Sequence, residues 1–196
     1  EWADLIDDSD KLRTIADPTS PYAINGAQAL GRAMDDVIIA AATATSLTGE
    51  DGTTSTTFPS AQTATTTAGG LTVAKLREAM QLLIAAEVDV DMETLVCAIG
   101  AQQHDDLLSE TQAISLDFTN KPVLVDGRIK AFMGFNFIDS QRLALSGTNR
   151  TVVCWAKSGL HLGIWGDIDV EIGPRPDKSY STQVYVKGTF GATRIE

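Results

Sequence analysis

The residue types best suited to catalysis are few in this sequence and poorly arranged for it. His104 precedes Asp105 and Asp106, an order that could supply a general base and the carboxylate that orients it. Adjacent residues on a helix point in different directions, however, and the chain has no Gly-x-Ser-x-Gly nucleophile motif. His161 alternates with leucines in the segment LHLGIW, which predicts a position on the wetter face of a strand. We therefore expect no catalytic residues and no enzyme activity.

A run of carboxylates near the beginning of the sequence is the best candidate for a metal site. Its members are Asp4, Asp7, Asp8 and Asp10. The run lacks the glycine and the distal glutamate of the twelve-residue calcium loop, so a solvated or subunit-facing charge run is the better interpretation. Neither a Gly-x-Gly-x-x-Gly pattern nor a Walker phosphate loop occurs. The sequence predicts no metal site and no cofactor site.

The two cysteines, Cys97 and Cys154, lie within the apolar segments LVCAI and VVCWA. A thiol in such a setting usually behaves as a small buried hydrophobic group. A disulfide would require an oxidising compartment, and no targeting segment points to one. With only these two cysteines and two histidines, and neither a CxxC nor an H-x-x-x-H spacing, a structural zinc site is also unfavourable.

Length and composition are those of an ordinary globular chain. The 196 residues suffice for one or two domains, and 43% hydrophobic with 21% charged residues are usual proportions. No apolar run approaches the roughly 20 residues of a membrane helix, and no signal peptide is recognisable, so we expect a soluble protein made in the cytoplasm. The net charge of −11 repels the phosphate backbone and disfavours specific nucleic-acid binding.

Two amphipathic helices are predicted from apolar residues at steps of three and four. The first begins near Gly26, because Asp17, Pro18 and Pro21 should stop a helix before it. Its apolar stripe is expected to face a β region and consists of Ala27, Leu30, Met34, Val37, Ile38 and Ala41, with Arg32, Asp35 and Asp36 outside. The second helix follows Thr72 as N-cap, with Leu76, Ala79, Met80, Leu83 and Ile84 on one face.

The segment between these helices, residues 43–68, holds eleven threonines and almost no large apolar side chain. It cannot build a core of its own. We interpret it as either a flexible connector or a surface loop that contacts a neighbouring subunit. Residues 53–57 could form an exposed strand within it.

The rest of the chain alternates strand signals with turns. Residues 94–99 form an apolar run expected in the centre of a sheet, residues 102–108 a short helix, and Asp126-Gly127 a tight hairpin turn. Further strands are predicted at 151–156, 160–165, 168–172 and 182–190, with a break at 173–178. In the last strand Val184, Val186 and Phe190 should face one way, and Gln183, Tyr185, Lys187 and Thr189 the other.

These elements occur in an order that resembles one family of proteins. The pattern D-x-x-D-x-x-R-x-x-x-D-P-x-x-x-Y comprises Asp7, Asp10, Arg13, Asp17, Pro18 and Tyr22, and ALGRAMDDVIIAAA follows at residues 29–42. Together they resemble the major capsid proteins of tailed bacteriophages, which have the Hong Kong 97 fold, and the second block looks like the spine helix of that fold. Residues 93–108, 123–137 and 151–196 are similar to later strands and a short helix of the same family. No single motif is specific, but the order extends along nearly the whole chain.

The resemblance implies an α+β fold of two domains. Residues 1–69 with 166–196 would form the peripheral domain, which contains the spine helix, and residues 70–165 the axial domain. It also implies a structural protein of the virion that self-assembles, as pentamers and hexamers of itself, into an icosahedral shell enclosing the phage DNA without sequence-specific binding. Scaffolding, portal or decoration proteins would be further partners, and no membrane is expected. Because this family usually has an N-terminal arm and an extended loop upstream, the sequence is expected to be a fragment. The alternatives are an encapsulin-like nanocompartment shell protein and, less favoured, a small α/β hydrolase.

Overall fold

The computed structural model describes the chain except for residues 8–18, 65–68, 111–123, 126, 148 and 196. It divides into two compact units, each discontinuous in sequence. Unit 1 comprises Glu1–Ile38 and Leu162–Ala192, and unit 2 comprises Ile39–His161 and Thr193–Glu196. The predicted division at residues 69, 70, 165 and 166 uses different boundaries, and its assignment to peripheral and axial domains stays a prediction. None of the described helices is long and apolar enough to cross a membrane.

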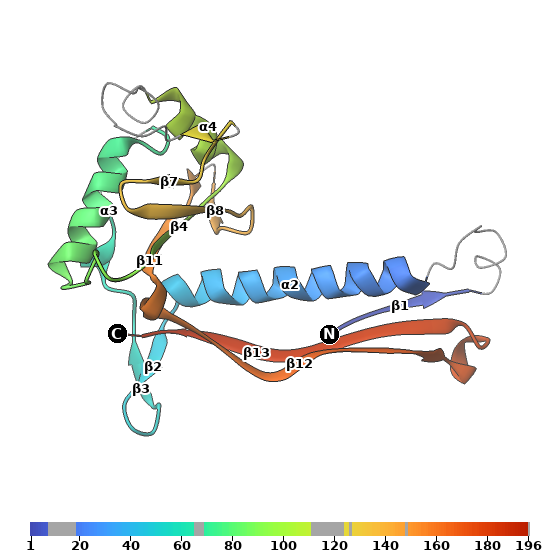
Figure 1. The fold of residues 1–196 in the computed structure, drawn as a ribbon. Coiled ribbons are helices and arrows are strands. Elements are labelled where there is room, and N and C mark those ends of the chain that lie inside the picture. Colours follow the sequence, from blue (N-terminus) through green and yellow to red (C-terminus); the bar gives the residue numbers. More distant parts are fainter. Residues whose placement is uncertain (8–18, 65–68, 111–123, 126, 148, 196) are drawn as a thin grey trace. The chain divides into compact units, whose positions relative to one another are not determined.

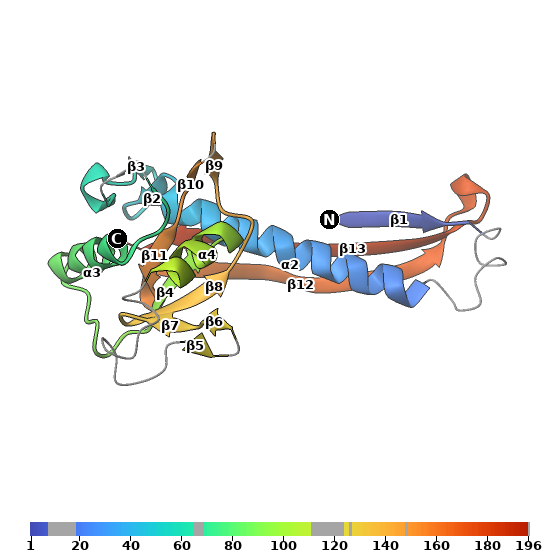
Figure 2. The ribbon, with the colours of Figure 1, turned by 90° about the horizontal axis from the view of Figure 1, so that it is seen from above.

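Unit 1 is a long helix on a three-stranded sheet (Figures 1 and 2). The helix α2 runs over Thr19–Thr43, so that its last turn belongs to unit 2. The strands are β1 (Trp2–Ile6), β12 (Leu160–Pro174) and β13 (Thr182–Arg194), in the spatial order β1-β13-β12. β1 is antiparallel to β13, with Trp2 opposite Val186. The first and last parts of the described chain therefore share one sheet.

The helix α2 begins seven residues before the predicted start at Gly26, so that prediction was wrong at this end. Pro21 does not stop the helix because it lies in the first turn, where the backbone N–H has no acceptor within the helix and a proline loses nothing. Among the residues expected on the buried stripe, Leu30 is fully buried and Met34, Val37, Ile38 and Ala41 are half-buried. Arg32 and Asp35 are exposed as predicted, whereas Asp36 is half-buried.

The core of unit 1 is small. Its buried members are Ile6, Leu30, Val184 and Val186, with Trp2, Tyr22, Ala23 and Phe190 packed against them. Gly26 lets the helix approach the sheet: a Cβ at this position would lie 2.6 Å from atoms of both Trp2 and Val186. The predicted alternation of β13 is confirmed, since Val184 and Val186 are buried while Lys187 and Thr189 are exposed.

Strand β12 corrects a second prediction. The two short strands expected at 160–165 and 168–172 form one strand of 15 residues, which continues through Gly166 and Asp167. The break expected at 173–178 is present only from Arg175 on, because Gly173 and Pro174 still belong to β12; the 3-10 helix η3 (Pro176–Lys178) then makes the turn into β13. A glycine weakens a strand but does not interrupt its hydrogen bonding, whereas a proline removes a donor.

Unit 2 is built around a four-stranded mixed sheet in the order β11-β4-β8-β7. These strands are β4 (Leu95–Ile99), β7 (Ala131–Phe132), β8 (Phe135–Asp139) and β11 (Val153–Ala156). As predicted, β4 is central and buried, parallel to β8 and antiparallel to β11. Between β7 and β8 the chain turns through Met133 and Gly134, both at positive φ, as a tight hairpin turn requires.

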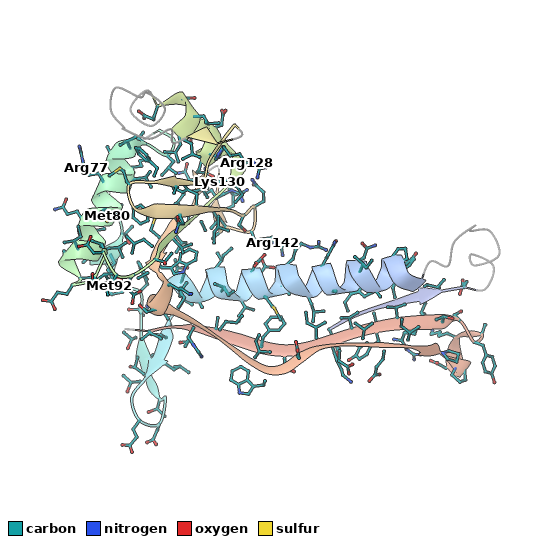
Figure 3. The ribbon with its side chains drawn as sticks, in the orientation of Figure 1. Arg77, Met80, Met92, Arg128, Lys130 and Arg142 are labelled. Atoms are coloured by element: carbon teal, nitrogen blue, oxygen red, sulfur yellow. The ribbon has the colours of Figure 1, made fainter. Side chains whose placement is uncertain are left out.

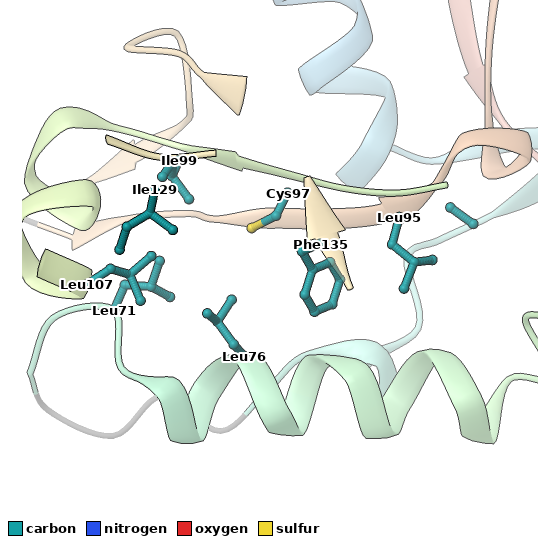
Figure 4. Close-up of a cluster of buried hydrophobic side chains, with 9 residues drawn as sticks. Leu71, Leu76, Leu95, Cys97, Ile99, Leu107, Ile129 and Phe135 are labelled. Atoms are coloured by element: carbon teal, nitrogen blue, oxygen red, sulfur yellow. The ribbon is translucent and has the colours of Figure 1, made fainter. Parts of the chain in front are cut away.

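The helix α3 (Val73–Ala85) packs on one face of this sheet, with Leu76 directed at the buried cluster (Figure 4). The buried residues of the cluster are Leu71, Leu76, Leu95, Cys97, Ile99, Leu107, Ile129, Phe135 and Ala156. Thr72 caps the helix by accepting a hydrogen bond from Lys75 N–H, as predicted. Ala79, Met80 and Leu83 also pack against the cluster, but Ile84 is exposed, so its predicted burial was wrong.

Short elements complete unit 2. The helix α4 (Ala101–Ser109) follows β4, and hairpins join β5 (Leu124–Val125) to β6 (Arg128–Ile129) and β9 (Leu145–Ser146) to β10 (Asn149–Arg150). The threonine-rich segment forms a hairpin of β2 (Ser46–Thr48) and β3 (Thr54–Thr56), followed by the 3-10 helix η1 (Ser60–Gln62). Another 3-10 helix, η2 (Lys157–Gly159), precedes β12.

Candidate assembly surface

The two faces of the unit 1 sheet can be assigned from one set of ion pairs. Lys187 Nζ on β13 lies 2.8 Å from Glu171 Oε1 and 3.2 Å from Asp169 Oδ2 on β12. Alternate residues of a strand point to opposite faces, so the odd-numbered residues of both strands share the face away from α2. The even-numbered residues share the other face, which is turned toward α2. Val184 and Val186 on this face belong to the same buried cluster as Leu30 of the helix.

The even-numbered face of β12 carries a row of aliphatic side chains that α2 leaves uncovered. We call Ile164, Ile168, Val170 and Ile172 the β12 row; their exposed fractions are 52%, 37%, 40% and 51%. The row lies on a strand at the edge of the sheet, because β12 pairs only with β13 among the described strands. An exposed apolar row beside a free strand edge is suited to binding another protein segment, which would bury the side chains and pair with the backbone.

The odd-numbered face is mostly polar, and its large aromatic residues include Trp165 on β12 and Tyr185 on β13. Trp165 is 78% exposed, and its ring lies over two glycines, since a Cβ added at Gly163 or Gly191 would come within 3.3 Å or 3.1 Å of it. Hydrogen bonds from Lys187 to Glu171 and Asp169 raise the pKa of that lysine. On this face two carboxylates thus share one ammonium group, so this group of three side chains has a net negative charge.

The end of the β12–β13 hairpin is fixed by polar contacts. Arg175 pairs with Asp177 at 2.6 Å, and a side-chain hydrogen bond from the guanidinium holds the pKa of Asp177 below its ordinary value. The hydroxyl of the buried Ser181 donates to Asp7 Oδ1 at 2.6 Å. Tyr180, next to it, is 67% exposed. The hairpin end is therefore held by a contact within it and by one with Asp7, and it still presents the Tyr180 ring to solvent.

Unit 2 also exposes apolar side chains, but they are scattered. Met92, between α3 and β4, is 86% exposed (Figure 3). The others lie on separate parts of the chain: Leu47 on β2, Ile84 on α3, Ile138 on β8, Leu145 on β9 and Ile195 after β13. Single exposed apolar residues are common on protein surfaces, whereas four exposed aliphatic residues on one face of one strand are not. The β12 row is therefore the stronger candidate for an interface.

The two histidines, His104 and His161, lie in different parts of the structure. His104 Nε2 accepts a hydrogen bond from Ile129 N–H at 3.2 Å, and Asp106 Oδ2 accepts one from Leu71 N–H at 2.9 Å. The two side chains thus serve different parts of the backbone and do not form a base with its orienting carboxylate. His161 is exposed on β12, as the alternation of LHLGIW predicted.

The acidic run gives no metal centre within the described residues. Asp7 accepts the Ser181 hydroxyl, Asp4 accepts its neighbour's N–H, and Asp8 and Asp10 lie outside the described part. Within the same limits, no group of three or more potential His, Cys, Asp or Glu ligands comes together. The calcium interpretation therefore gains no support from Asp4 and Asp7.

The β12 row was not among the features predicted from the sequence. Its signal is visible in DIDVEI at residues 167–172, where aliphatic and acidic residues alternate. Such alternation predicts a strand with one dry face. It does not reveal that a single helix leaves the dry face of this strand partly open.

The fold of this chain is similar to that of solved phage structures, three of which are described here. No curated protein matched the sequence. A chain from Mycobacterium phage Che8 matches the structure with a TM-score of 0.67 and 20% identity, over 98% of this chain and 65% of that one. The capsid structure of the cyanophage P-SCSP1u matches with a TM-score of 0.64 and 19% identity, over 100% and 68%. The mature capsid of bacteriophage PhiM1 matches with a TM-score of 0.63 and 13% identity, over 98% and 66%.

These structural matches share the mixed helix and sheet fold, and the predicted α+β capsid fold is confirmed. The chain spans 65% of the Che8 chain, so about a third of that protein has no counterpart here. The family model for phage capsid proteins matches residues 1–196. This chain belongs to the phage capsid protein family.

Proposed function

We propose that this chain is the structural subunit of a phage capsid, and that copies of it assemble into the icosahedral shell around the genome. The observation that carries the proposal is the β12 row on a free sheet edge, in a chain of the capsid family. Repeated by symmetry, modest contacts of this kind suffice to hold a closed shell together. The virion is then the site of function, and the role is structural and not enzymatic.

The same proposal assigns roles to the two units. Unit 1, with α2 as the spine helix, would be the peripheral domain, and unit 2 the axial domain around the five-fold and six-fold axes. The division into two compact units supports this assignment. Scaffolding, portal or decoration proteins would be additional partners of the assembled shell.

The net charge of −11 suits a wall around DNA. A wall that bound phosphates tightly would hinder packing and ejection, whereas an acidic surface releases no counterions from DNA and holds it weakly. Packaged DNA is thus enclosed without sequence-specific contacts.

Two other functions were considered. A nanocompartment shell protein would enclose an enzyme cargo instead of DNA, and the family match favours the phage capsid. A small α/β hydrolase would need a nucleophile beside a histidine, but His104 Nε2 is occupied by Ile129 N–H. Neither alternative has an observation of its own in its favour.

The decisive experiment is assembly of the complete gene product that contains this sequence. We expect closed particles in electron microscopy and light scattering from the unmodified protein, and loss of particles in Ile172→Asp, because a carboxylate in the β12 row opposes its burial. The matched control is Ile138→Asp, a strand residue with the same 51% exposed fraction that lies outside the row.

Both variants must first be shown to fold, by circular dichroism and denaturation of the dissociated protein. Particles of normal size and yield from Ile172→Asp would refute the role of the row. Absence of closed particles from the unmodified protein under all assembly conditions would contradict the shell-forming function itself.

A further inference from the structure

Cys97 and Cys154 lie directly opposite each other on the antiparallel strands β4 and β11. In the same register Lys157 N–H donates to Thr94 carbonyl oxygen at 3.0 Å, which marks Thr94 and Lys157 as a hydrogen-bonded pair. Hydrogen-bonded and non-hydrogen-bonded pairs alternate along antiparallel strands, so the cysteines, three residues further along each strand, form a non-hydrogen-bonded pair. Cα atoms in such a pair are about 4.5 Å apart, within the range of about 4.4–6.8 Å found in disulfides.

The contact between the two cysteine side chains is consistent with this backbone pairing. The Cys154 thiol donates a hydrogen bond to Cys97 Sγ at 3.2 Å. Cys97 is fully buried among the side chains between the sheet and α3 (Figure 4), whereas Cys154 is half-buried. The hydrogen bond with Cys154 and burial both raise the pKa of Cys97, so this residue stays a thiol at neutral pH. The half-buried Cys154 is the sulfur that a small oxidant reaches first.

We propose that Cys97 and Cys154 are an oxidisable pair, which a peroxide converts into a disulfide between β4 and β11. Hydrogen peroxide oxidises the sulfur of Cys154 to a sulfenic acid, and its second oxygen leaves as water. The Cys97 thiol then transfers its proton to the sulfenic oxygen while its Sγ attacks the sulfenic sulfur, so that the S–S bond forms as that oxygen leaves as a second water. In total two thiols and one peroxide give one disulfide and two waters, so atoms and electrons balance.

The bond would connect residues that are 57 positions apart in the sequence. It would fasten the edge strand β11 to the central strand β4, in the unit that contains the larger core. A cytoplasm keeps such a pair reduced, and an oxidising medium outside the cell does not. The pair would then close after the protein leaves the cell in which it was made.

The test is mild oxidation of the folded protein with hydrogen peroxide, followed by removal of the peroxide, alkylation in denaturant and mass spectrometry. We expect the number of alkylatable thiols per chain to fall from two to none, with a mass loss of two hydrogens and a reductant-sensitive peptide that links Cys97 to Cys154. The chain should remain uncrosslinked to other chains on a non-reducing gel. The same treatment in denaturant should give a lower yield of the linked peptide, because proximity is lost.

The variant Cys154→Ser is the matched control, since its remaining thiol is the buried one. We expect Cys97 in this variant to survive the same peroxide treatment and to become alkylatable on unfolding. Three results would overturn the proposal: both thiols intact in the oxidised wild type, sulfinic or sulfonic acid at Cys154 in place of the disulfide, or a disulfide between two chains. An equal yield of the linked peptide in denaturant would also overturn it, and this comparison does not depend on any variant folding.

Discussion

The two units bury apolar surface in different ways. In unit 2 the strand β4 lies inside a mixed sheet, and nine buried residues from helices and strands form its cluster. In unit 1 the strands β12 and β13 are two to three times longer than β4, yet the buried apolar cluster has only four members among the described residues, because one helix covers one face of the sheet. A sheet of this kind is incompletely stabilised by its own chain. The difference suggests that unit 2 is stable by itself, whereas unit 1 gains stability from what binds its open surfaces.

The largest single effect is expected in the unit 2 core. Phe135 on β8 is fully buried, and Phe135→Ala should lower the free energy of unfolding by about 3–5 kcal/mol. Phe137, on the same strand and only half-buried, is the control, and its alanine variant should lose clearly less. Chemical denaturation of both variants measures the difference. Equal losses would mean that the packing of β8 has been misjudged.

A smaller loss of stability is expected from the buried leucine of α2 in unit 1. Leu30→Ala should cost about 2 kcal/mol, the lower end for leucine, because a thin two-layer core can close around the missing side chain. Hydrogen exchange should lose protection in β1 and β13 but not in β4. Ile24→Ala on the same helix is the control: this side chain is 55% exposed, and the change should stay within about 0.5 kcal/mol. Exchange that rises equally in both units would argue against two separately stabilised parts.

Two glycines of α2 should respond to alanine with opposite signs. At Gly26 a new methyl group would overlap Trp2 and Val186, so Gly26→Ala should destabilise the protein by about 1–3 kcal/mol. At Gly31 a new methyl group would meet nothing within 4 Å, so Gly31→Ala should stabilise the helix by about 0.5–1 kcal/mol. Thermal unfolding monitored by circular dichroism distinguishes the two. If both variants shift the midpoint of thermal unfolding in the same direction, α2 does not approach the sheet as closely at Gly26 as described.

The smallest effect concerns the ion pairs on the open face. Because Glu171 and Asp169 raise the pKa of Lys187 above its ordinary 10.5, this group stabilises the folded state below that pH and loses its contribution as the pH rises through the folded pKa. The side chains are exposed, so Lys187→Gln should be only slightly less stable than wild type at neutral pH. The two proteins should converge at alkaline pH in urea denaturation. Tyr185→Phe controls for the nearby phenol, whose pKa the contact with Glu1 raises.

Local sequence signals predicted the elements of unit 2 well. Thr72 marks the N-cap of α3, the apolar run at 94–99 marks a central strand, and Gly127 marks the β5–β6 turn at positive φ; Asp126 itself lies outside the described residues. Each signal acts within a few residues, through capping, burial or turn geometry. The errors arose where a local rule had an exception, as with Pro21 in the first turn of α2 and Gly166 inside β12.

The candidate assembly surface could not be predicted in the same way. Ile168 and Ile172 have the alternation of a buried strand face, and their exposure depends on how far the covering helix extends across the sheet. The proximity of Cys97 and Cys154 likewise depends on the pairing register of strands that are far apart in sequence. Burial against a distant element is a tertiary property that neither periodicity nor propensity contains.

The pairing of β1 with β13 also determines when the unit 1 sheet can fold during protein synthesis. Tyr185 donates to Glu1 across 184 positions, and Ser181 donates to Asp7 across 174, whereas most of unit 2 is one continuous stretch, Ile39–His161. A ribosome releases the chain from its N-terminal side, so unit 2 can fold while β13 is still being translated. Strand β1 must wait, unpaired, until β13 emerges. The sheet that carries the β12 row is therefore completed last, and the row is not presented on a finished sheet before translation through β13 has ended.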